Sequence, residues 1–470
     1  MFPVGIPGVE AGKRSRRGPS GKGATPVDAG GQGSGETGST GRRRWIVPWQ
    51  LAGMMFLQYF GLGAWVVPLT RYLQAPTAEG GLGFDPFQVA LIYSTFAFGA
   101  LAAPLLVGPL ADRWFAVERV LAVTHASMAV LMTLAAWACI SPLTGPEATL
   151  ALLFVSLLGY AIGCQITLTL TNVISFRNLE DRAGTFWYVR LTGTLGWIVS
   201  GFVVGWLLEP VSVQPLGVAA VASGVLALLA PGLPHTPPKG YGRPIREVLG
   251  LPAVQLFTQR SLVVFAVVLF VGGAMNQFYT VFTSRYLADL GVQADLGRWG
   301  RWTPELIMTL AQWCEMGCMA VTPWLLRQLG LKRVMLLGLA GWLLRNALLY
   351  SGWRAGIVAI ALPMHGWSYA FYTLVGMHYV DRQAPPHLRA GAQALVTFLA
   401  HGPAILAGNL LAGMIVAAHR QELWTDWEAV WRWPLLAYLA ILLLFAALFR
   451  EGQASSVSPT GFTSSRQAQA

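Results

Sequence analysis

Residues 306–325 read LIMTLAQWCEMGCMAVTPWL, a stretch long and apolar enough to cross a lipid bilayer as a helix. The hydrocarbon core of a bilayer is about 30 Å thick, and a helix needs roughly 20 residues to span it. Gln312 and Glu315 lie near the middle of the stretch, where a charge that faces lipid is strongly disfavoured. About one helical turn separates them, so they point to the same side. We therefore expect this face to line a wet cavity, with Glu315 as a functional residue.

The composition is that of an integral membrane protein. Of 470 residues, 54% are hydrophobic and 11% are charged, whereas soluble domains carry about 25% charged residues. The formal net charge of +11 comes from Arg and Lys in the connections and tails, which the positive-inside rule explains. We therefore expect a lipid bilayer as partner and no nucleic acid.

The four cysteines all fall within apolar stretches, where cysteine acts as a small hydrophobic residue. Cys314 and Cys318 are one helical turn apart, but no His or further Cys lies near them in the sequence. We expect no metal and no other cofactor. The sequence also lacks a G-x-S-x-G nucleophile motif and a metal-spaced His and carboxylate cluster, so we do not expect an enzyme.

Twelve apolar stretches predict an all-α membrane protein with two six-helix bundles. Residues 1–44 are rich in Gly, Ser, Pro, Lys and Arg and predict a disordered cytoplasmic tail. A polar, basic linker at 233–260 separates an N-terminal bundle (45–232) from a C-terminal bundle (261–450), and a second disordered tail covers 451–470. The expected spans are 46–69, 89–107, 120–140, 148–170, 188–208, 216–231, 262–284, 306–325, 334–350, 357–380, 392–417 and 430–449.

Basic residues predict the orientation of these spans. The connections on the same side as the N-terminus carry more Arg and Lys than the opposite connections. The positive-inside rule therefore places both termini in the cytoplasm, as an even number of spans requires, in a multi-pass protein of the cell inner membrane. The residues that set this bias are Arg113, Arg119, Arg177, Arg182, Lys239, Arg243, Arg246, Arg260, Arg327, Lys332, Arg333, Arg382 and Arg389.

The connection between the second and third expected spans, residues 108–113, reads GPLADR. It resembles the G-x-L-A-D-R loop of the major facilitator superfamily, in which a glycine allows close helix contact and ion pairs latch the two halves. Gly108, Asp112 and Arg113 are therefore candidate gating residues, and the alternative is an ordinary basic turn. Together with six spans on each side of a linker, this motif predicts the major facilitator fold.

Two arginines, Arg190 and Arg345, fall inside expected spans. A guanidinium in the membrane keeps its charge and needs an anion. Glu315 is the one clearly mid-span carboxylate, so we expect one of the two arginines to pair with it. Arg190 would bridge the two bundles, whereas Arg345 would reach an interface or hold the C-terminal bundle together. Helix-to-helix hydrogen bonds explain some of the single Asn and Thr residues inside spans without a substrate, and contact with a substrate is the alternative for the others.

Seven segments, in order, carry a resemblance to the nucleoside:proton symporter family of the major facilitator superfamily, the bacterial nucleoside permeases. The resemblance runs over residues 51–450 and implies a substrate pocket lined from both halves. Its segments are FLQYFGLGAW, RLTGTLGW, LPHTP, the Gln312-x-x-Glu315 pair, WLLRNALLYSG, RAGAQ and TDWEAVW.

The pocket residues that this resemblance implies can be matched one at a time. Trp197 stands in place of a pocket Phe, and Thr280 stands in place of an Asn. Where the family has a Tyr followed by a Phe-Asp pair, this chain has His365 and then Tyr369 and Ala370, so a second acid is missing. The matching residues, of which Glu315 and Arg190 are the expected proton-coupling pair, are Arg190, Thr194, Gln277, Gln312 and Glu315.

We expect a monomeric transporter that takes up nucleosides with protons by alternating access. One carboxyl group suffices for coupling, because a dry environment favours its neutral form and a nearby guanidinium favours its charged form. His365 is either a further titrating group or a histidine that packs helices together. The alternatives are a transporter of the same fold for a sugar or other polar metabolite, an efflux protein, and a sensor that no longer transports.

Overall fold

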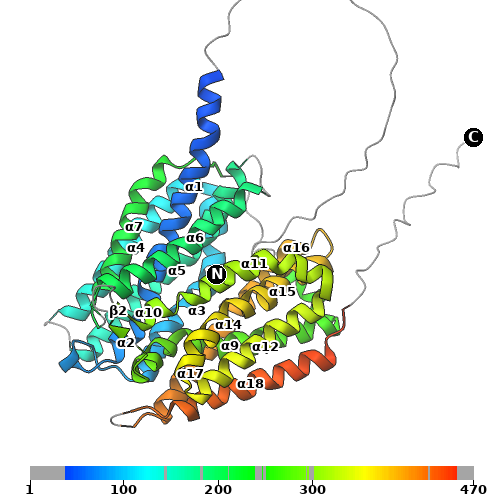
Figure 1. Ribbon diagram of the computed structural model, residues 1–470. Helices are drawn as coiled ribbons and strands as arrows, with labels where there is room; N and C mark the ends of the chain where they lie inside the picture. The colour runs from blue at the N-terminus through cyan, green and yellow to red at the C-terminus, as the bar shows by residue number, and fades with distance from the viewer. Residues whose placement is uncertain are drawn as a thin grey trace, which may run out of the picture.

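The computed structural model describes residues 37–141, 145–179, 184–209, 211–238, 246, 250–292, 294–295, 301–421 and 424–451. These residues form long helices packed side by side, as Figure 1 shows, with the first helices on one side of the molecule and the last on the other. The described part contains two strands of two residues each, β1 (Ala294–Asp295) and β2 (Arg301–Trp302), which pair antiparallel. The prediction of an all-helical membrane fold is confirmed.

The helices follow the order of the expected spans. The first half of the chain contains α1 (Thr37–Val66), α2 (Leu69–Gln74), η1 (Thr77–Glu79), α3 (Pro86–Val107), η2 (Gly108–Trp114), α4 (Val117–Ile140), α5 (Pro146–Asn178), α6 (Gly184–Phe202), η3 (Val203–Leu207), α7 (Gln214–Leu229) and η4 (Ala230–Gly232). The second half contains η5 (Leu251–Thr258), α9 (Arg260–Asp289), α10 (Pro304–Ile307), α11 (Leu310–Leu329), α12 (Leu331–Ser351), α13 (Arg354–Gly356), η7 (Ile357–Ala361), α14 (Leu362–Ser368), η8 (Tyr369–Leu374), α15 (Val375–Gln383), α16 (Arg389–His401), α17 (Pro403–Ala418) and α18 (Trp427–Leu448).

In the described part of the chain, ten helices are long and apolar enough to cross a membrane. The expected spans at 306–325 and 357–380 are not among them, so the count of twelve is not fully confirmed. The first is broken between α10 and α11 by a turn at Met308 and Thr309. The second is divided by the π-helical turns η7 and η8. Apolar length alone does not reveal such breaks, which are frequent at functional sites.

The first span is also broken, at Val67 and Pro68 between α1 and α2. Proline has no N–H and cannot continue the hydrogen-bond ladder of a helix. The Tyr93 hydroxyl of α3 donates to the Val66 carbonyl and accepts from the Thr70 hydroxyl on α2. Side chains therefore satisfy polar groups that the break exposes.

Helix α1 begins at Thr37, before the predicted end of the first tail at residue 44, and the predicted domain bounds stay a prediction. Gly38 and Gly41 disfavour a helix when read alone. Extending an existing helix avoids the cost of nucleation, and the long span that follows provides that helix. The predicted tails at 1–36 and 452–470, and residues 239–245 and 247–249 of the predicted linker, lie outside the described residues.

The GPLADR segment forms the π-helical turn η2 at the end of α3. Arg113 is exposed. The surroundings of Gly108 and the side chain of Asp112 are not described, so the predicted gating latch stays a prediction.

The two halves contact each other closely at the end of the molecule that carries α2, β2 and α10, which we call the distal end. Here α17 lies along α3, and the Arg420 guanidinium donates to the Phe84 carbonyl at 3.4 Å. A Cβ on Gly205 would lie 2.6 Å from Thr303 Oγ1, so only glycine permits this approach of the two halves. The opposite end carries the start of the linker, where the Thr236 N–H donates to Glu118 Oε2 at 3.0 Å.

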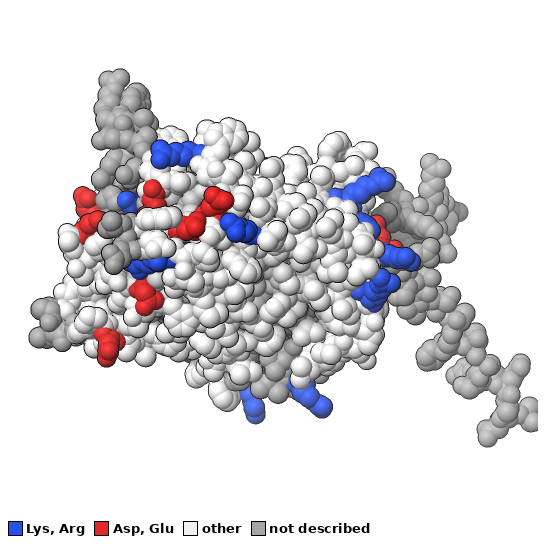
Figure 2. All heavy atoms as spheres, turned by 90° about the horizontal axis from the view of Figure 1, so that it is seen from below, with Lys and Arg blue, Asp and Glu red and all other residues white. Residues whose placement is uncertain are grey.

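The surface has the charge distribution of a membrane protein. Figure 2, seen from below, shows a broad uncharged face with Lys, Arg, Asp and Glu gathered toward its margins. Large apolar side chains are exposed on several helices, including Val130, Leu228 and Leu443. Exposed apolar surface of this extent is what a bilayer covers.

The first prediction concerns topology. Single cysteines placed in the linker at Pro238 and in the tail at Ser455, in a variant without the native cysteines, should react with an impermeant maleimide only from the cytoplasmic side. The physical reason is the bias of Arg and Lys toward that side. Labelling of the linker cysteine from outside intact cells would show that the orientation is reversed.

Candidate transport site

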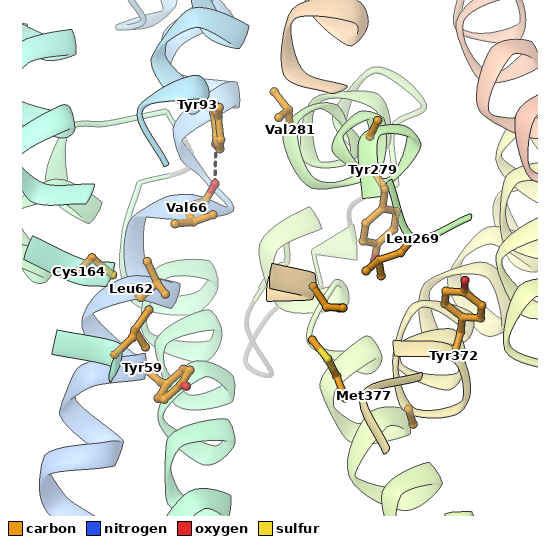
Figure 3. Packing of buried hydrophobic residues seen from close by; sticks show 14 of the residues in the cluster. Tyr59, Leu62, Val66, Tyr93, Cys164, Leu269, Tyr279, Val281, Tyr372 and Met377 are labelled. Atoms are coloured by element: carbon orange, nitrogen blue, oxygen red, sulfur yellow. Dashed lines mark hydrogen bonds between the residues drawn. The ribbon is translucent and has the colours of Figure 1, made fainter. Parts of the chain in front are cut away.

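A central cavity of about 310 Å³ lies between the two halves. Its volume is within the range of sites for small molecules. The first half contributes wall residues from α1, α3, α5, α6 and η3, and the second half contributes residues from α9, α10, α11, α12, α14, η8, α16 and α17. Figure 3 shows Tyr59, Leu62 and Val66 of α1 opposite Leu269 and Tyr279 of α9, all of which line the cavity.

Glu315 on α11 lines this cavity and is 4% exposed. Its position depends on Gly366 of α14, which packs against the α11 backbone. A Cβ on Gly366 would lie 2.5 Å from the Glu315 nitrogen and 2.0 Å from the Ala311 carbonyl oxygen. The missing side chain therefore allows α14 to press on α11 at the acid and to hold it against the cavity.

Two amides share the cavity with this acid. Gln277 Nε2 on α9 donates to the Gly273 carbonyl at 3.2 Å. With its amide oriented to satisfy its neighbours, Gln312 donates to the Met308 and Thr309 carbonyls at 3.2 and 3.3 Å, at the break before α11. Each amide nitrogen is thus held by its own helix, and each amide oxygen is left to accept a hydrogen bond from a ligand.

A buried guanidinium lies behind the cavity wall. Arg345 on α12 is 0% exposed, and its Nη1 donates to Asn276 Oδ1 and to His365 Nδ1, each at 2.9 Å. Because arginine carries only donors, His365 Nδ1 must accept, and the ring proton lies on Nε2. His365 is therefore a neutral imidazole held by Arg345, an arrangement that favours hydrogen bonding over titration. Arg345 holds the second half together and makes no ion pair with Glu315.

The same cluster fixes the rings around it. The Tyr279 ring stacks on the His365 ring with centroids 4.7 Å apart, and the Arg345 guanidinium lies 4.4 Å from the Tyr279 centroid. Asn276 Nδ2 also donates to the hydroxyl oxygen of Thr280 at 3.3 Å. The wall formed by α9, α12 and α14 is thus a connected polar and aromatic layer, in which the Nε and Nη2 of Arg345 have no hydrogen-bond partner.

Arg190 on α6 takes a different place from the one predicted. Its guanidinium lies 4.4 Å from the centroid of Tyr59, a cation–π distance, and no ion pair joins it to Glu315. Both Arg190 and Glu315 are among the described residues, so the predicted ion pair is absent in this conformation. Neither Arg190 nor Thr194 lines the cavity. Tyr59 does line the cavity, and its ring covers one face of the Arg190 guanidinium.

The structure therefore brings together seven of the nine substrate-site residues that the sequence predicted. They are Trp197, Gln277, Thr280, Gln312, Glu315, His365 and Tyr369.

Sequence reasoning left several cavity residues out of the site. Tyr59 lies within the FLQYFGLGAW motif, and Asn276 directly precedes the predicted residue Gln277. The sequence therefore contained an indication of both residues. Glu305 follows Thr303 and Pro304, and this order is typical of the start of a helix. Nothing local indicated that its side chain reaches the cavity.

Two bundles around a central cavity with a buried acid define a secondary transporter of the major facilitator architecture. The chain belongs to the nucleoside H+ symporter family, because the family model with that description matches residues 46–454. It is accordingly a multi-pass membrane protein of a transporter family.

Individual relatives agree with this family. The chain is similar to the putative nucleoside transporter YegT of Escherichia coli K12, with 32% identity over 86% of this chain and 93% of that protein. It is 28% identical to the xanthosine permease of the same organism over 85% of this chain and 94% of that protein. A crystal structure of a mutant of the nucleoside transporter NupG matches with a TM-score of 0.77 and 27% identity, covering 86% of this chain and all of that one (100%).

The second prediction concerns the two amides. Gln277→Ala and Gln312→Ala should each weaken nucleoside binding by about 1–3 kcal/mol, because each leaves a polar group of the ligand unpaired. Binding to purified protein in detergent measures the effect. Gln328→Ala, a change of an exposed glutamine at the end of α11, is the matched control. Unchanged affinity in both cavity variants would place the binding site elsewhere.

The third prediction concerns the guanidinium behind the wall. Arg345→Met should destabilise the protein by about 1–3 kcal/mol for each of the two acceptors left unpaired, Asn276 and His365. Unfolding of the purified protein in detergent measures this loss. The exposed Arg354, changed in the same way, should stay within about 0.5 kcal/mol of the parent. Equal stabilities of the two variants would contradict a structural role for Arg345.

Proposed function

We propose that this protein takes up nucleosides together with protons, by alternating access of the central cavity. The observation that carries the proposal is the presence of Glu315, Gln277 and Gln312 on one cavity between the two halves. The family to which the chain belongs and the functions for which its relatives are named support the same cargo.

The cavity offers the hydrogen-bond groups that a nucleoside requires. Amide oxygens of Gln277 and Gln312 can accept from ribose hydroxyls or base N–H groups, and the Nε2–H of His365 can donate to a base nitrogen or carbonyl. Trp197 and Tyr369 provide aromatic surface on opposite halves of the cavity, and flat bases stack on such rings. A ligand that contacts both halves has a different affinity for each arrangement of the halves. Alternating access requires such a difference in affinity.

Glu315 and Arg190 are the proposed proton-coupling pair. A carboxyl group in a dry cavity favours its neutral form, and one in contact with a guanidinium favours its charged form. In this conformation the Arg190 guanidinium is held by Tyr59. A rotation of the halves that brings Glu315 of the second half into contact with the Arg190 guanidinium would release the proton, and the reverse rotation would take up another.

We also propose the cell inner membrane as location, with both termini in the cytoplasm and one chain as the functional unit. The halves would then be residues 45–232 and 261–450, joined by the cytoplasmic linker 233–260. The bias of Arg and Lys supports this orientation. A closed distal end would make the present conformation one that faces the cytoplasm.

The fourth prediction tests the coupling acid. Glu315→Gln keeps the shape of the side chain but cannot ionise. Vesicles that contain this variant should still exchange labelled nucleoside and should lose accumulation driven by a pH gradient. Arg190→Ala should impair both activities, because the acid loses its counter-charge.

The control for this prediction is Glu428→Gln, which removes an exposed carboxylate outside the cavity (63% exposed). It should retain both exchange and accumulation. If Glu315→Gln still concentrates nucleoside when pH is the only driving force, Glu315 is not the coupling acid. If no variant and no parent vesicle exchanges any nucleoside, the cargo is wrong.

A further inference from the structure

A second acid lines the cavity, and it belongs to neither the predicted site nor the motifs of the sequence. Glu305 on α10 is 4% exposed and forms part of the cavity wall at the distal end. Its Oε2 lies 3.7 Å from Nη1 of Arg71 on α2, whose side chain is 12% exposed. The two residues come from different halves, so this buried ion pair joins the halves.

The ion pair lies beside close contacts between the halves. Gly201 and Gly205, at the end of α6 and in η3, face the turn of chain that carries Glu305. A Cβ on Gly201 would lie 2.5 Å from the Thr309 methyl carbon, and one on Gly205 would lie 2.9 Å from Leu306 Cβ. Gly201, Glu305 and Thr309 all line the cavity. The ion pair and these glycine contacts together close the distal end of the cavity.

The geometry of the ion pair indicates a loose contact, which can be broken. A structural Arg–carboxylate pair is commonly bidentate, with two short hydrogen bonds. Here the distance of 3.7 Å exceeds a hydrogen bond, and neither Arg71 Nη1 nor Glu305 Oε1 has a hydrogen-bond partner. Each charge is therefore stabilised by electrostatic attraction to its partner. Each side chain also keeps an unpaired hydrogen-bonding atom, which water would satisfy if the halves parted.

We propose that Arg71 and Glu305 form the distal gate of the transport pathway. The pair stabilises the arrangement in which the cavity is closed at this end, and it separates when the cavity opens there. In the open arrangement both charges meet water. Removal of either partner leaves the other charge buried and unpaired only in the closed arrangement, so either removal favours opening. The inference rests on the alternating access of the proposed function, and it identifies the residues that control one of its two openings.

Accessibility of the cavity from the distal side tests the gate. Val204 on η3 lines the cavity and is 6% exposed. In a variant without the native cysteines, Val204→Cys should react slowly with an impermeant maleimide added to right-side-out vesicles. Glu305→Gln and Arg71→Gln should each raise the labelling rate about tenfold, which corresponds to a shift of about 1.4 kcal/mol in the equilibrium.

Two further variants make the test specific. The charge swap, Arg71→Glu with Glu305→Arg, restores an ion pair and should bring labelling back to within about twofold of the parent, as expected for a direct pairwise interaction. Glu428→Gln removes an exposed carboxylate near the same end, at the start of α18, and should leave labelling unchanged.

The result that overturns the gate is a charge swap that labels as fast as the single variants, or single variants that label as slowly as the parent. Nucleoside exchange by the same vesicles separates this outcome from the fate of the proposed function. If labelling responds as expected while no nucleoside exchanges, the gate stands and the cargo is wrong. If nucleosides exchange and labelling does not respond, the cargo stands and the gate is elsewhere.

Discussion

Polar groups inside a bilayer must find their partners within the protein, and this constraint shapes every part of the cavity. Arg345 is the strongest case, because a guanidinium cannot become neutral and lies completely buried. Asn276 and His365 accept from its Nη1, and Tyr279 covers its face, whereas its Nε and Nη2 have no hydrogen-bond partner. Three cavity residues are thereby fixed in position by a residue that does not itself line the cavity. The binding surface of the second half thus depends on a structural group behind it.

The breaks in the helices follow from the same constraint. Side chains donate to carbonyls at both breaks. Tyr93 donates to the Val66 carbonyl, and Gln312 adds a further hydrogen bond to each of the Met308 and Thr309 carbonyls, which also accept from backbone N–H groups. Both Tyr93 and Gln312 line the cavity. Irregular backbone is tolerated in a membrane where it borders protein or a cavity. The interrupted spans therefore mark the transport pathway.

The sequence predicted the fold well because apolar length is a local property that each span carries by itself. It predicted Glu315, Gln277 and Gln312 because a polar group inside an apolar span is costly unless it has a partner or faces a cavity. It could not predict that Arg190 would lie against Tyr59, since that depends on how α1 and α6 cross. Resemblance to a family assigns a residue to a position, but the conformation decides which neighbour that residue contacts.

The distal ion pair shows a second limit of sequence reasoning. In the sequence, Glu305 is explained completely by the start of a helix, where an acidic residue interacts favourably with the helix dipole. Its partner Arg71 lies in the other half of the chain, and in sequence it is only one of the basic residues in a connection. Long-range pairing of two residues that both have a sufficient local explanation leaves no trace in a single sequence.

The charges that can pair across the cavity are divided between the halves, whereas Arg345 stays behind the wall of the second half. The two acids that line it, Glu315 and Glu305, belong to the second half, whereas Arg190 and Arg71 belong to the first. The halves therefore attract each other across the cavity, and separating opposite charges in a medium of low dielectric constant is costly. An acid that takes up a proton no longer opposes the separation, and a ligand or water that bonds to the parted groups lowers its cost. In the proposed mechanism, a proton or ligand that binds at Glu315, and the making or breaking of the Arg71–Glu305 pair, shift the halves between their two arrangements.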